Sequence, residues 1–189
     1  MKYKLTDETK ELCGMLLHQI VCVTAFASVA VGDTGGWVES EKNLSQYGDA
    51  WVYGDAWVYG DAKVYGNAKV YGNAEVYGNA KVYGNAKVYG DAKVYGNAKV
   101  YGDAKVSGNA EVSGNAEVSQ SSDYAVYKNT WSSMRYFTWT RSNNKWRVGC
   151  FYGSGEELIE KAYKDSKLSG DCYKAVVEMR NKLTELESA

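Results

Sequence analysis

The chain has 189 residues, a formal net charge of -1 at pH 7, no proline and a single histidine. A charge so close to zero does not favour electrostatic binding to nucleic acid, so no specific DNA binding is predicted. The four cysteines lack the spacing of metal ligands, so neither a metal site nor any other cofactor is expected, and free thiols in a reducing cytoplasm are predicted for Cys13, Cys22, Cys150 and Cys172.

An apolar stretch covers residues 12–31 and invites comparison with a signal peptide, with Ala25-Phe26-Ala27 as its cleavage site. The first eleven residues hold as many acidic as basic side chains, so the basic segment that opens a signal peptide is missing. His18 and Gln19 interrupt the apolar run, which argues against a transmembrane helix. We therefore expect a cytoplasmic protein without membrane contact.

The same stretch is rich in β-prone side chains and predicts two short strands, Leu16–Phe26 and Val29–Val31. They belong to an N-terminal β cap that we expect to cover residues 1–46. A glycine-rich turn follows the second strand. After it, Trp37 and Val38 are expected to cover the open end of the repeat that comes next, because a stacked repeat otherwise exposes unpaired backbone groups there.

The segment from Tyr47 to Val118 consists of twelve consecutive hexapeptide units without an insertion. Ten units read Tyr-Gly-(Asp/Asn)-Ala-x-Val, and the last two begin with Ser instead of Tyr. In each unit Ala and Val fall on one face of an extended segment, while x and Tyr fall on the other. Internal periodicity of this length outranks every other fold signal in the chain.

Two architectures fit a sharp turn at each Gly-Asx pair. In an antiparallel meander, the residues that flank a two-residue turn lie opposite each other on one face. Here those residues are Tyr and Ala, which belong to opposite faces, so neither side of a meander could become a core. If each pair is the corner of a tube, Ala and Val always point inward. Three sides make an 18-residue coil, and the repeat makes about four coils stacked in parallel, about 4.8 Å apart.

The repeat Val-x-Gly-(Asn/Asp)-Ala-x resembles the hexapeptide repeat of left-handed β-helix proteins. The segment from Gly35 to Gln46, with the sequence GGWVESEKNLSQ, resembles the lead-in of short hexapeptide-repeat proteins found in bacterial, prophage and phage genomes. The first resemblance implies a parallel, left-handed β-helix over residues 47–118. The second implies a phage or prophage origin.

Stacking of whole coils arranges the outward side chains in columns. A tyrosine column and a lysine column form one candidate binding set, and two tryptophans occupy outward positions of the first coil: Tyr65, Tyr83, Tyr101; Lys69, Lys87, Lys105; Trp51, Trp57. Aromatic rings beside cations suit a flat or anionic ligand, so the functional interpretation is that these residues bind a nucleotide, a nucleic-acid strand or an acidic protein surface. The alternative is that the columns only stabilise the stack and that the tryptophans pack against the N-terminal cap.

The resemblance also raises acyl transfer, because the best-known enzymes with this repeat are trimeric acyltransferases that use a histidine as general base. The repeat contains no histidine, and His18 lies in the N-terminal strand region. The catalytic residue of that family therefore has no counterpart here. We predict no enzymatic activity and no catalytic residue, and keep an acyltransferase as an alternative.

Residues 119–189 are predicted to form a C-terminal α+β domain. A strand is expected at Tyr124–Trp131, followed by a hairpin of Met134–Arg141 and Lys145–Tyr152. Aromatic and basic residues crowd this hairpin, and three of them join the candidate partner-binding set: Arg135, Trp139 and Arg147.

Two helices are expected to end the chain. A capping box at Ser154 opens the first, which runs to about Lys164. The second begins at Asp171 and carries one apolar stripe: Cys172, Val176, Met179, Leu183 and Leu186. We interpret this stripe as packing on the hairpin, with a subunit contact as the alternative.

These patterns predict a mainly β protein, with a parallel β-helix between an N-terminal β cap and a C-terminal α+β domain. Its leading predicted function is non-enzymatic binding or scaffolding, in which a homo-oligomer, with a trimer favoured, holds a host protein or an anionic nucleotide. The resemblance to phage proteins suggests interference with a host defence system. A purely structural spacer is a further alternative.

Overall fold

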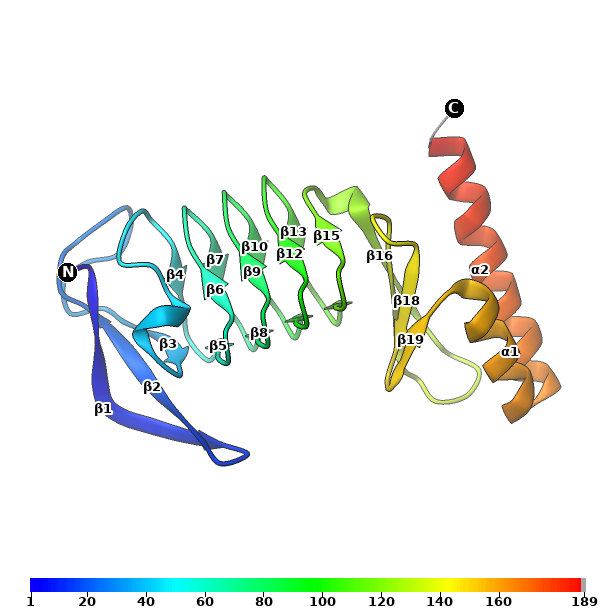
Figure 1. The fold of residues 1–189 in the computed structure, drawn as a ribbon, viewed down its shortest axis with the longest axis horizontal. Coiled ribbons are helices and arrows are strands. Elements are labelled where there is room, and N and C mark those ends of the chain that lie inside the picture. Colours follow the sequence, from blue (N-terminus) through cyan, green and yellow to red (C-terminus); the bar gives the residue numbers. More distant parts are fainter. Residues whose placement is uncertain (188–189) are drawn as a thin grey trace. The chain divides into compact units, whose positions relative to one another are not determined.

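The structure is a computed structural model that describes residues 1–187. The chain divides into two compact units (Figure 1). The first comprises Met1–Tyr124 together with the short segment Thr140–Asn143, and the second comprises Ala125–Trp139 and the chain from Asn144 onward. Each unit has its own core and is described separately.

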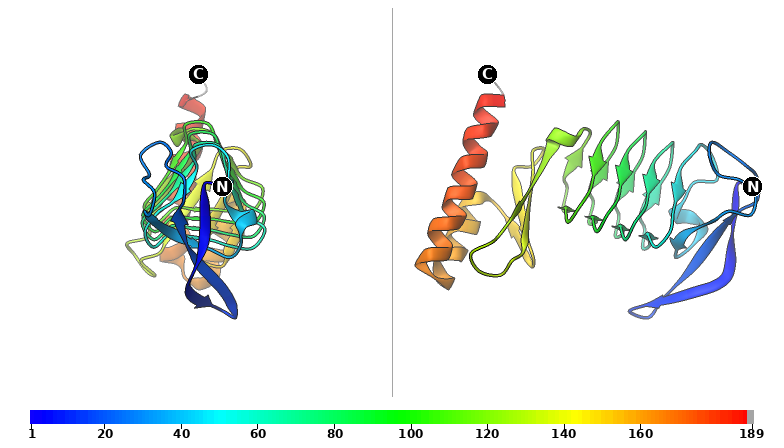
Figure 2. Two further views of the ribbon diagram at one scale, coloured as in Figure 1. Left: turned by 90° about the vertical axis from the view of Figure 1, so that its left-hand side faces the viewer. Right: turned by 180° about the vertical axis from the view of Figure 1, so that it is seen from behind.

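The repeat of the first unit is a parallel β-solenoid, as predicted. Each six-residue unit contributes one two-residue strand: β4 (Trp51–Val52), β5 (Trp57–Val58), β6 (Lys63–Val64), β7 (Lys69–Val70), β8 (Glu75–Val76), β9 (Lys81–Val82), β10 (Lys87–Val88), β11 (Lys93–Val94), β12 (Lys99–Val100), β13 (Lys105–Val106), β14 (Glu111–Val112) and β15 (Glu117–Val118). Every third strand joins the same sheet, so one sheet has the order β13-β10-β7-β4 and another β15-β12-β9-β6. Successive coils overlie one another when the stack is viewed along its length (Figure 2, left).

The coils stack with a strict 18-residue register, visible in the pairing of Lys87 with Lys69 and Lys105. Val88 of β10 lies in the same way between Val70 and Val106 of the neighbouring coils. Backbone bonds join the coils on both sides of this valine: Lys87 N–H donates to the Ala104 carbonyl at 2.9 Å and Tyr89 N–H to the Val106 carbonyl at 3.0 Å. The alanines and valines of the repeat are at most 1% exposed, so small aliphatic side chains fill the bore.

The corners are held by glycine and asparagine. Gly84 has φ +70°, a backbone conformation that costs a residue with a Cβ about 1–2 kcal/mol. Beside it, Asn85 continues an amide ladder, accepting from Asn67 Nδ2 at 3.1 Å and donating to Asp103 Oδ1 at 3.0 Å. The Gly-Asx pairs therefore turn the chain and also bond neighbouring coils to each other.

The N-terminal strands differ from the predicted ones. β1 (Tyr3–Leu12) and β2 (Met15–Cys22) form an antiparallel hairpin that turns at Cys13-Gly14, and β2 pairs in turn with β3 (Thr34–Val38). The predicted strand Leu16–Phe26 thus ends early, at Cys22. The predicted strand Val29–Val31 is wrong, because within it only Val29 makes a β-bridge, to Phe26. β1 went unpredicted because its mixed acidic and basic side chains show neither an apolar run nor an alternating pattern.

The solenoid begins earlier than the six-residue repeat. Trp37 and Val38 pair in parallel with Trp57 and Val58 of β5, and Leu44 bridges to Val64. These partners are further apart in sequence than the paired residues within the repeat, and the one-turn helix η1 (Glu41–Asn43) lies between the two paired sites. The structure therefore contains about five coils, and Trp37 and Val38 are part of the additional one.

Polar side chains satisfy the open N-terminal end of the repeat. Lys2 Nζ donates to the Ala50 carbonyl at 2.8 Å and to the Gly48 carbonyl at 3.2 Å. Asn43 Nδ2 donates to the carbonyls of Gly60 and Ala62, at 2.9 Å each. Each side chain thus replaces, at one corner, the backbone donors that a preceding coil would have supplied.

Tyr124 covers part of the other end. Its hydroxyl donates to the Lys105 carbonyl at 2.9 Å and accepts from Ser107 N–H at 3.2 Å. Ser107 is the first unit at which the repeat replaces Tyr by Ser. The one-turn helix η2 (Ser121–Asp123) leads into this contact, and Arg141 N–H donates to the Asp123 carbonyl at 2.8 Å.

A four-stranded sheet and two helices form the C-terminal α+β part. The strands are β16 (Tyr124–Lys128), β17 (Tyr136–Thr140), β18 (Lys145–Val148) and β19 (Phe151–Gly153), in that order across the sheet. The helices are α1 (Gly155–Asp165) and α2 (Lys167–Glu187). The predicted strand Lys145–Tyr152 divides into two because Gly149, with φ +55°, reverses the chain.

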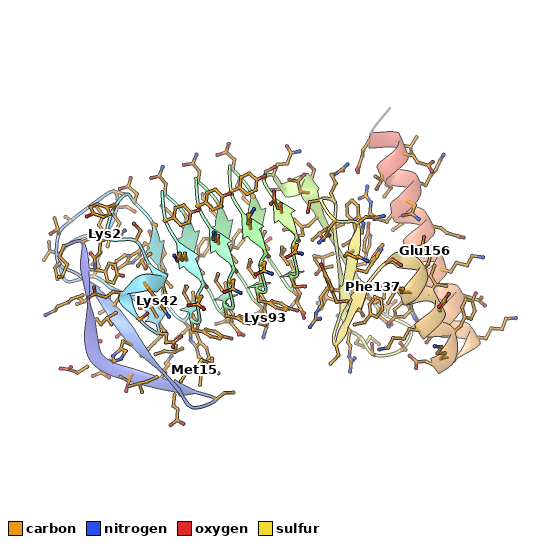
Figure 3. All side chains as sticks on the ribbon, in the orientation of Figure 1. Lys2, Met15, Lys42, Lys93, Phe137 and Glu156 are labelled. Carbon is orange, nitrogen blue, oxygen red and sulfur yellow. The ribbon has the colours of Figure 1, made fainter. Side chains whose placement is uncertain are left out.

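Large side chains from the sheet and both helices form the core of the second unit. Phe137, Trp139 and Trp146 are at most 1% exposed and pack with Val148, Leu158 and Val177. Phe137 lies between the sheet and helix α1 (Figure 3). The Ser154 hydroxyl accepts from Glu157 N–H at 3.2 Å, which confirms the predicted capping box at the start of α1.

The apolar stripe of α2 is not the face that this helix buries. Val177 and Arg180 are 3% and 6% exposed, and the Arg180 guanidinium lies 4.6 Å from the Trp139 ring centroid. Met179 and Leu183 are 44% and 39% exposed, and Leu186 is 63% exposed. The interpretation of the stripe as hairpin packing is therefore wrong for these three residues, because Arg180 stacks on Trp139 and turns the neighbouring face of the helix inward.

Candidate binding surface on the repeat body

Three outward faces run along the coil stack, one for each sheet. The face of β4-β7-β10-β13, which we call the lysine face, carries Lys69, Lys87 and Lys105 in one column. Within residues 1–187, none of these three ammonium groups has a carboxylate within ion-pairing distance. Like charges on neighbouring strands repel each other, so this column destabilises the stack of coils in the isolated chain.

Each of the other two faces contains a lysine that is paired with a glutamate. On the face of β5-β8-β11-β14, Lys93 Nζ lies 2.8 Å from Glu75 Oε1, which raises the pKa of Lys93 through this hydrogen bond (Figure 3). On the face of β6-β9-β12-β15, Lys99 Nζ lies 2.7 Å from Glu117 Oε1. The lysine face is thus the side of the repeat on which charge is least compensated.

Stacked tyrosines line all three faces. On the lysine face, Tyr71 and Tyr89 have ring centroids 4.8 Å apart and planes inclined by 2°. The predicted column Tyr65-Tyr83-Tyr101 stacks at 4.9 and 5.2 Å. This spacing matches the distance between coils, so each ring stacks on the ring of the next coil without shifting away from its own strand.

The structure separates the two columns that were predicted to act together. Tyr65, Tyr83 and Tyr101 extend the sheet of β6, where Tyr65 N–H donates to the Val82 carbonyl at 3.0 Å. Lys69, Lys87 and Lys105 belong to the next sheet, beyond the corner at Gly66-Asn67. The rings that accompany the lysine face are instead Tyr71 and Tyr89, which the predicted set left out.

The two predicted tryptophans lie at the N-terminal end of the stack. Trp51 is 1% exposed and packs edge-on against Tyr3 and Phe26, with centroids 6.1 and 5.4 Å away. It therefore presents no surface to a ligand, and packing against the N-terminal cap describes its environment. Trp57 is half-buried and lines a pocket with Lys10, whose Nζ lies 3.0 Å from Asp55 Oδ1.

The predicted residues of the C-terminal part have separate environments. Trp139 is 1% exposed, and its indole N–H donates to Asn144 Oδ1 at 2.8 Å, so the ring belongs to the core. Arg147 lies in β18 opposite Tyr152. Arg135 is exposed and lines a pocket of about 100 Å³ that also includes Lys161. Lys161 was not predicted as a site residue, because a single lysine on a predicted helix gives no sign that it lies beside a pocket.

The histidine, cysteine and acidic side chains are the next candidates for a catalytic or metal site. The Nδ1 atom of His18 lies 3.2 Å from the Thr6 carbonyl in the N-terminal hairpin. Across residues 1–187, no group of three histidine, cysteine or acidic side chains is placed to hold a metal ion. In the same part of the chain, no helix has both the length and the apolar composition needed to cross a membrane.

Alkaline pH is expected to unfold the first unit at lower denaturant concentration. Burial, aided by neighbouring carboxylate or tyrosine groups, raises the pKa of Tyr3, Tyr59, Tyr65 and Tyr71 above the ordinary value of 10. Above pH 10 the unfolded chain therefore loses phenol protons that the folded chain keeps, so stability falls as pH rises. Urea midpoints at pH 9, 10 and 11, with tyrosinate absorbance, would measure this.

Burial acts in the opposite direction on Lys2, whose pKa it lowers to about 8. Between that value and 10.5 the folded chain has lost a proton that the unfolded chain still holds, so this group makes stability rise with pH. The tyrosines with a raised pKa outnumber this single lysine, so a net loss of stability is expected above pH 10. Tyr59→Phe should flatten the decline, whereas Tyr47→Phe, at a ring that is 85% exposed, should not. An equal decline of stability in Tyr59→Phe and in the unaltered chain would contradict the expectation.

Comparison with known proteins gives one partial similarity. No protein-family model matches the chain. A stretch of 59 residues is 32% identical to the Escherichia coli (strain K12) protein described as "Uncharacterized acetyltransferase YdcK". The match covers 27% of this chain and 18% of that protein, so the chain spans less than a fifth of the length of this curated relative. This similarity assigns neither a family nor an activity to the chain.

Proposed function

We propose that the chain is a non-enzymatic binding protein whose lysine face binds an acidic surface of a macromolecular partner. The observation that carries the proposal is the column of Lys69, Lys87 and Lys105, which has no carboxylate partner within residues 1–187. The other two faces of the same repeat pair a lysine with a glutamate. An acidic partner would supply on the lysine face a counter-charge of the kind that Glu75 gives to Lys93 and Glu117 gives to Lys99.

The shape of this face favours a macromolecule over a small ligand. The three ammonium groups follow a straight column that spans about 10 Å, from the spacing of stacked strands. The stacked rings of Tyr71 and Tyr89 lie on the same face. Small-molecule sites are usually concave, whereas a regular row of charges beside aromatic rings matches an extended acidic surface.

The alternative of acyl transfer has less support. The relative that is described as an acetyltransferase shares only a partial match with this chain. A general base must reach the proton that it abstracts, and the single histidine of the sequence lies in the hairpin beside Thr6, outside the repeat. Calorimetry with acetyl-CoA distinguishes the two functions, since only the enzyme should bind it.

The lead-in resemblance supports a proposal for the source of the partner. The segment from Gly35 to Gln46 resembles that of short hexapeptide-repeat proteins of bacterial, prophage and phage genomes. We therefore propose a protein of the bacterial host, for example one of a defence system, as the acidic partner. A homo-oligomer, with a trimer favoured, would present several copies of the lysine face and strengthen binding through multivalency. Native mass spectrometry of the purified protein tests the oligomeric state.

Charge reversal on the lysine face is expected to weaken binding to an acidic polymer. The variant Lys69→Glu/Lys87→Glu should bind poly-L-glutamate at least about tenfold more weakly than the unaltered chain at low salt, because two attractions become repulsions. Fluorescence anisotropy with labelled poly-L-glutamate measures this. The unaltered chain should also lose affinity as salt is raised.

The repeat provides a matched control. Lys63→Glu/Lys81→Glu alters two lysines that neighbour each other in the same way on the next sheet, with the same change in net charge. It should keep more of the affinity than Lys69→Glu/Lys87→Glu, because on that face Lys99 is already paired with Glu117. Equal losses in both variants would show that net charge alone acts, and no binding by the unaltered chain would favour a structural spacer. Stronger binding to ATP than to poly-L-glutamate would favour a nucleotide ligand.

A further inference from the structure

A small pocket in the second unit combines an apolar floor with a charged rim. It has a volume of about 100 Å³ and lies among Arg135, the β18–β19 turn and the helices. Val148, Leu158 and Ala162 form the floor and are 6%, 2% and 3% exposed. The half-buried ring of Phe151 adds a further apolar wall.

Two cations lie at the rim of this pocket. The Arg135 side chain crosses the backbone of Gly149 so closely that a Cβ there would lie 2.9 Å from Nη1. Lys161 Nζ lies 5.8 Å from the centroid of the Phe151 ring. Asp165 also lines the rim, yet over the part of the chain that the structure describes, neither cation is ion-paired. The rim therefore carries an excess of one positive charge above an apolar floor.

We propose that this pocket binds a small amphipathic carboxylate, with its negative group between Arg135 and Lys161 and its aliphatic body on the floor. A water molecule occupies about 30 Å³, so the pocket has room for a branched body of about three or four carbon atoms. The C-terminal residue of a peptide that ends in leucine has this chemistry. Planar guanidinium groups bind carboxylates in two-point contacts, which suits Arg135 to the negative group.

Two exposed cysteines allow this proposal to be tested in the full chain. Cys150 lines the pocket, whereas Cys13 is exposed in the N-terminal hairpin of the other unit. Saturating N-acetyl-L-leucine should slow the alkylation of Cys150 by iodoacetamide at least about threefold, because the bound probe covers the thiol. Alkylation of Cys13 in the same sample should not change. Mass spectrometry of the two peptides reports both rates.

Two other probes separate the parts of the proposal. N-acetyl-L-leucinamide lacks the negative charge, and inorganic phosphate lacks the aliphatic body, so each should protect Cys150 much less than N-acetyl-L-leucine. Equal protection by the amide would overturn the role of the cations. Equal protection by phosphate would overturn the role of the apolar floor, and no protection by the acid would overturn the site itself.

Variants at the rim complete the test. Arg135→Gln should require at least about tenfold more N-acetyl-L-leucine for the same protection, because a charged hydrogen-bond donor is lost. Lys164→Gln changes an exposed lysine of the same helix that does not line the pocket, and it should behave like the unaltered chain. The site and the lysine face lie in different units, so either proposal can fail without the other.

Discussion

Replacement of Val88 by aspartate is expected to destabilise the repeat body strongly, with a large fall in its urea midpoint at 25 °C. Val88 is 0% exposed and lies between Val70 and Val106 in the bore. An aspartate there would place a carboxyl group among aliphatic side chains, with no donor to satisfy it, which costs on the order of 4 kcal/mol or more. Urea denaturation followed by circular dichroism measures the loss.

The neighbouring residue provides the control for this change. Lys87→Asp introduces the same side chain in the same strand, but on the outward face. It should shift the urea midpoint little, since surface substitutions usually change stability by less than about 0.5 kcal/mol. If both variants were equally stable, aliphatic side chains would not fill the bore, and the solenoid would be the wrong architecture for this repeat.

The repeat could be predicted from sequence because each of its units gives the same local information. The alternation of Ala and Val with Lys or Glu and Tyr decides which face is buried, and Gly-Asx marks each corner. The parity of Tyr and Ala around the corner excluded a meander without any structural knowledge. The structure confirms the parallel stack, the register of three units per coil and the inward valines.

The ends of the solenoid could not be predicted in this way. Trp37 and Leu44 are further from their partners in sequence than the 18 residues that separate paired positions of the repeat. A search for that spacing therefore does not find them. Lys2 and Asn43 close the end of the bore through single side chains that donate to backbone carbonyls. Such contacts depend on where the chain folds back, so no local sequence pattern predicts them.

The candidate site was predicted only in part. The lysine column was placed correctly in register because its spacing is that of the repeat. Its tyrosine companions were assigned to the wrong side of a corner: Tyr71 follows Lys69 on the same side of the coil, whereas Tyr65 lies beyond the corner at Gly66-Asn67. Trp51 and Trp139 were chosen because tryptophan is common in binding sites, yet both are buried. Trp51 is covered by Tyr3, which is distant in sequence, and Trp139 belongs to the core of the second unit.

The second large effect is expected at a corner glycine in the middle of the stack. Gly84 has φ +70°, and a Cβ built on it would lie 2.9 Å from the backbone nitrogen of Gly102 in the next coil. Gly84→Ala therefore has two costs, the left-handed backbone and a clash with backbone that cannot rotate away. Together they should lower the free energy of unfolding by about 3 kcal/mol.

Gly108→Ala separates these two costs. Gly108 has φ +65°, almost the same conformation, but a Cβ there would have no neighbour within 4 Å. Its substitution should cost only the backbone term, about 1 kcal/mol. The difference between the two urea-derived free energies thus measures how tightly one coil is stacked on the next. Equal costs would mean that neighbouring coils can move apart by a few tenths of an ångström, and the stacked tyrosines and the lysine column would then lack the fixed spacing that the proposed binding surface requires.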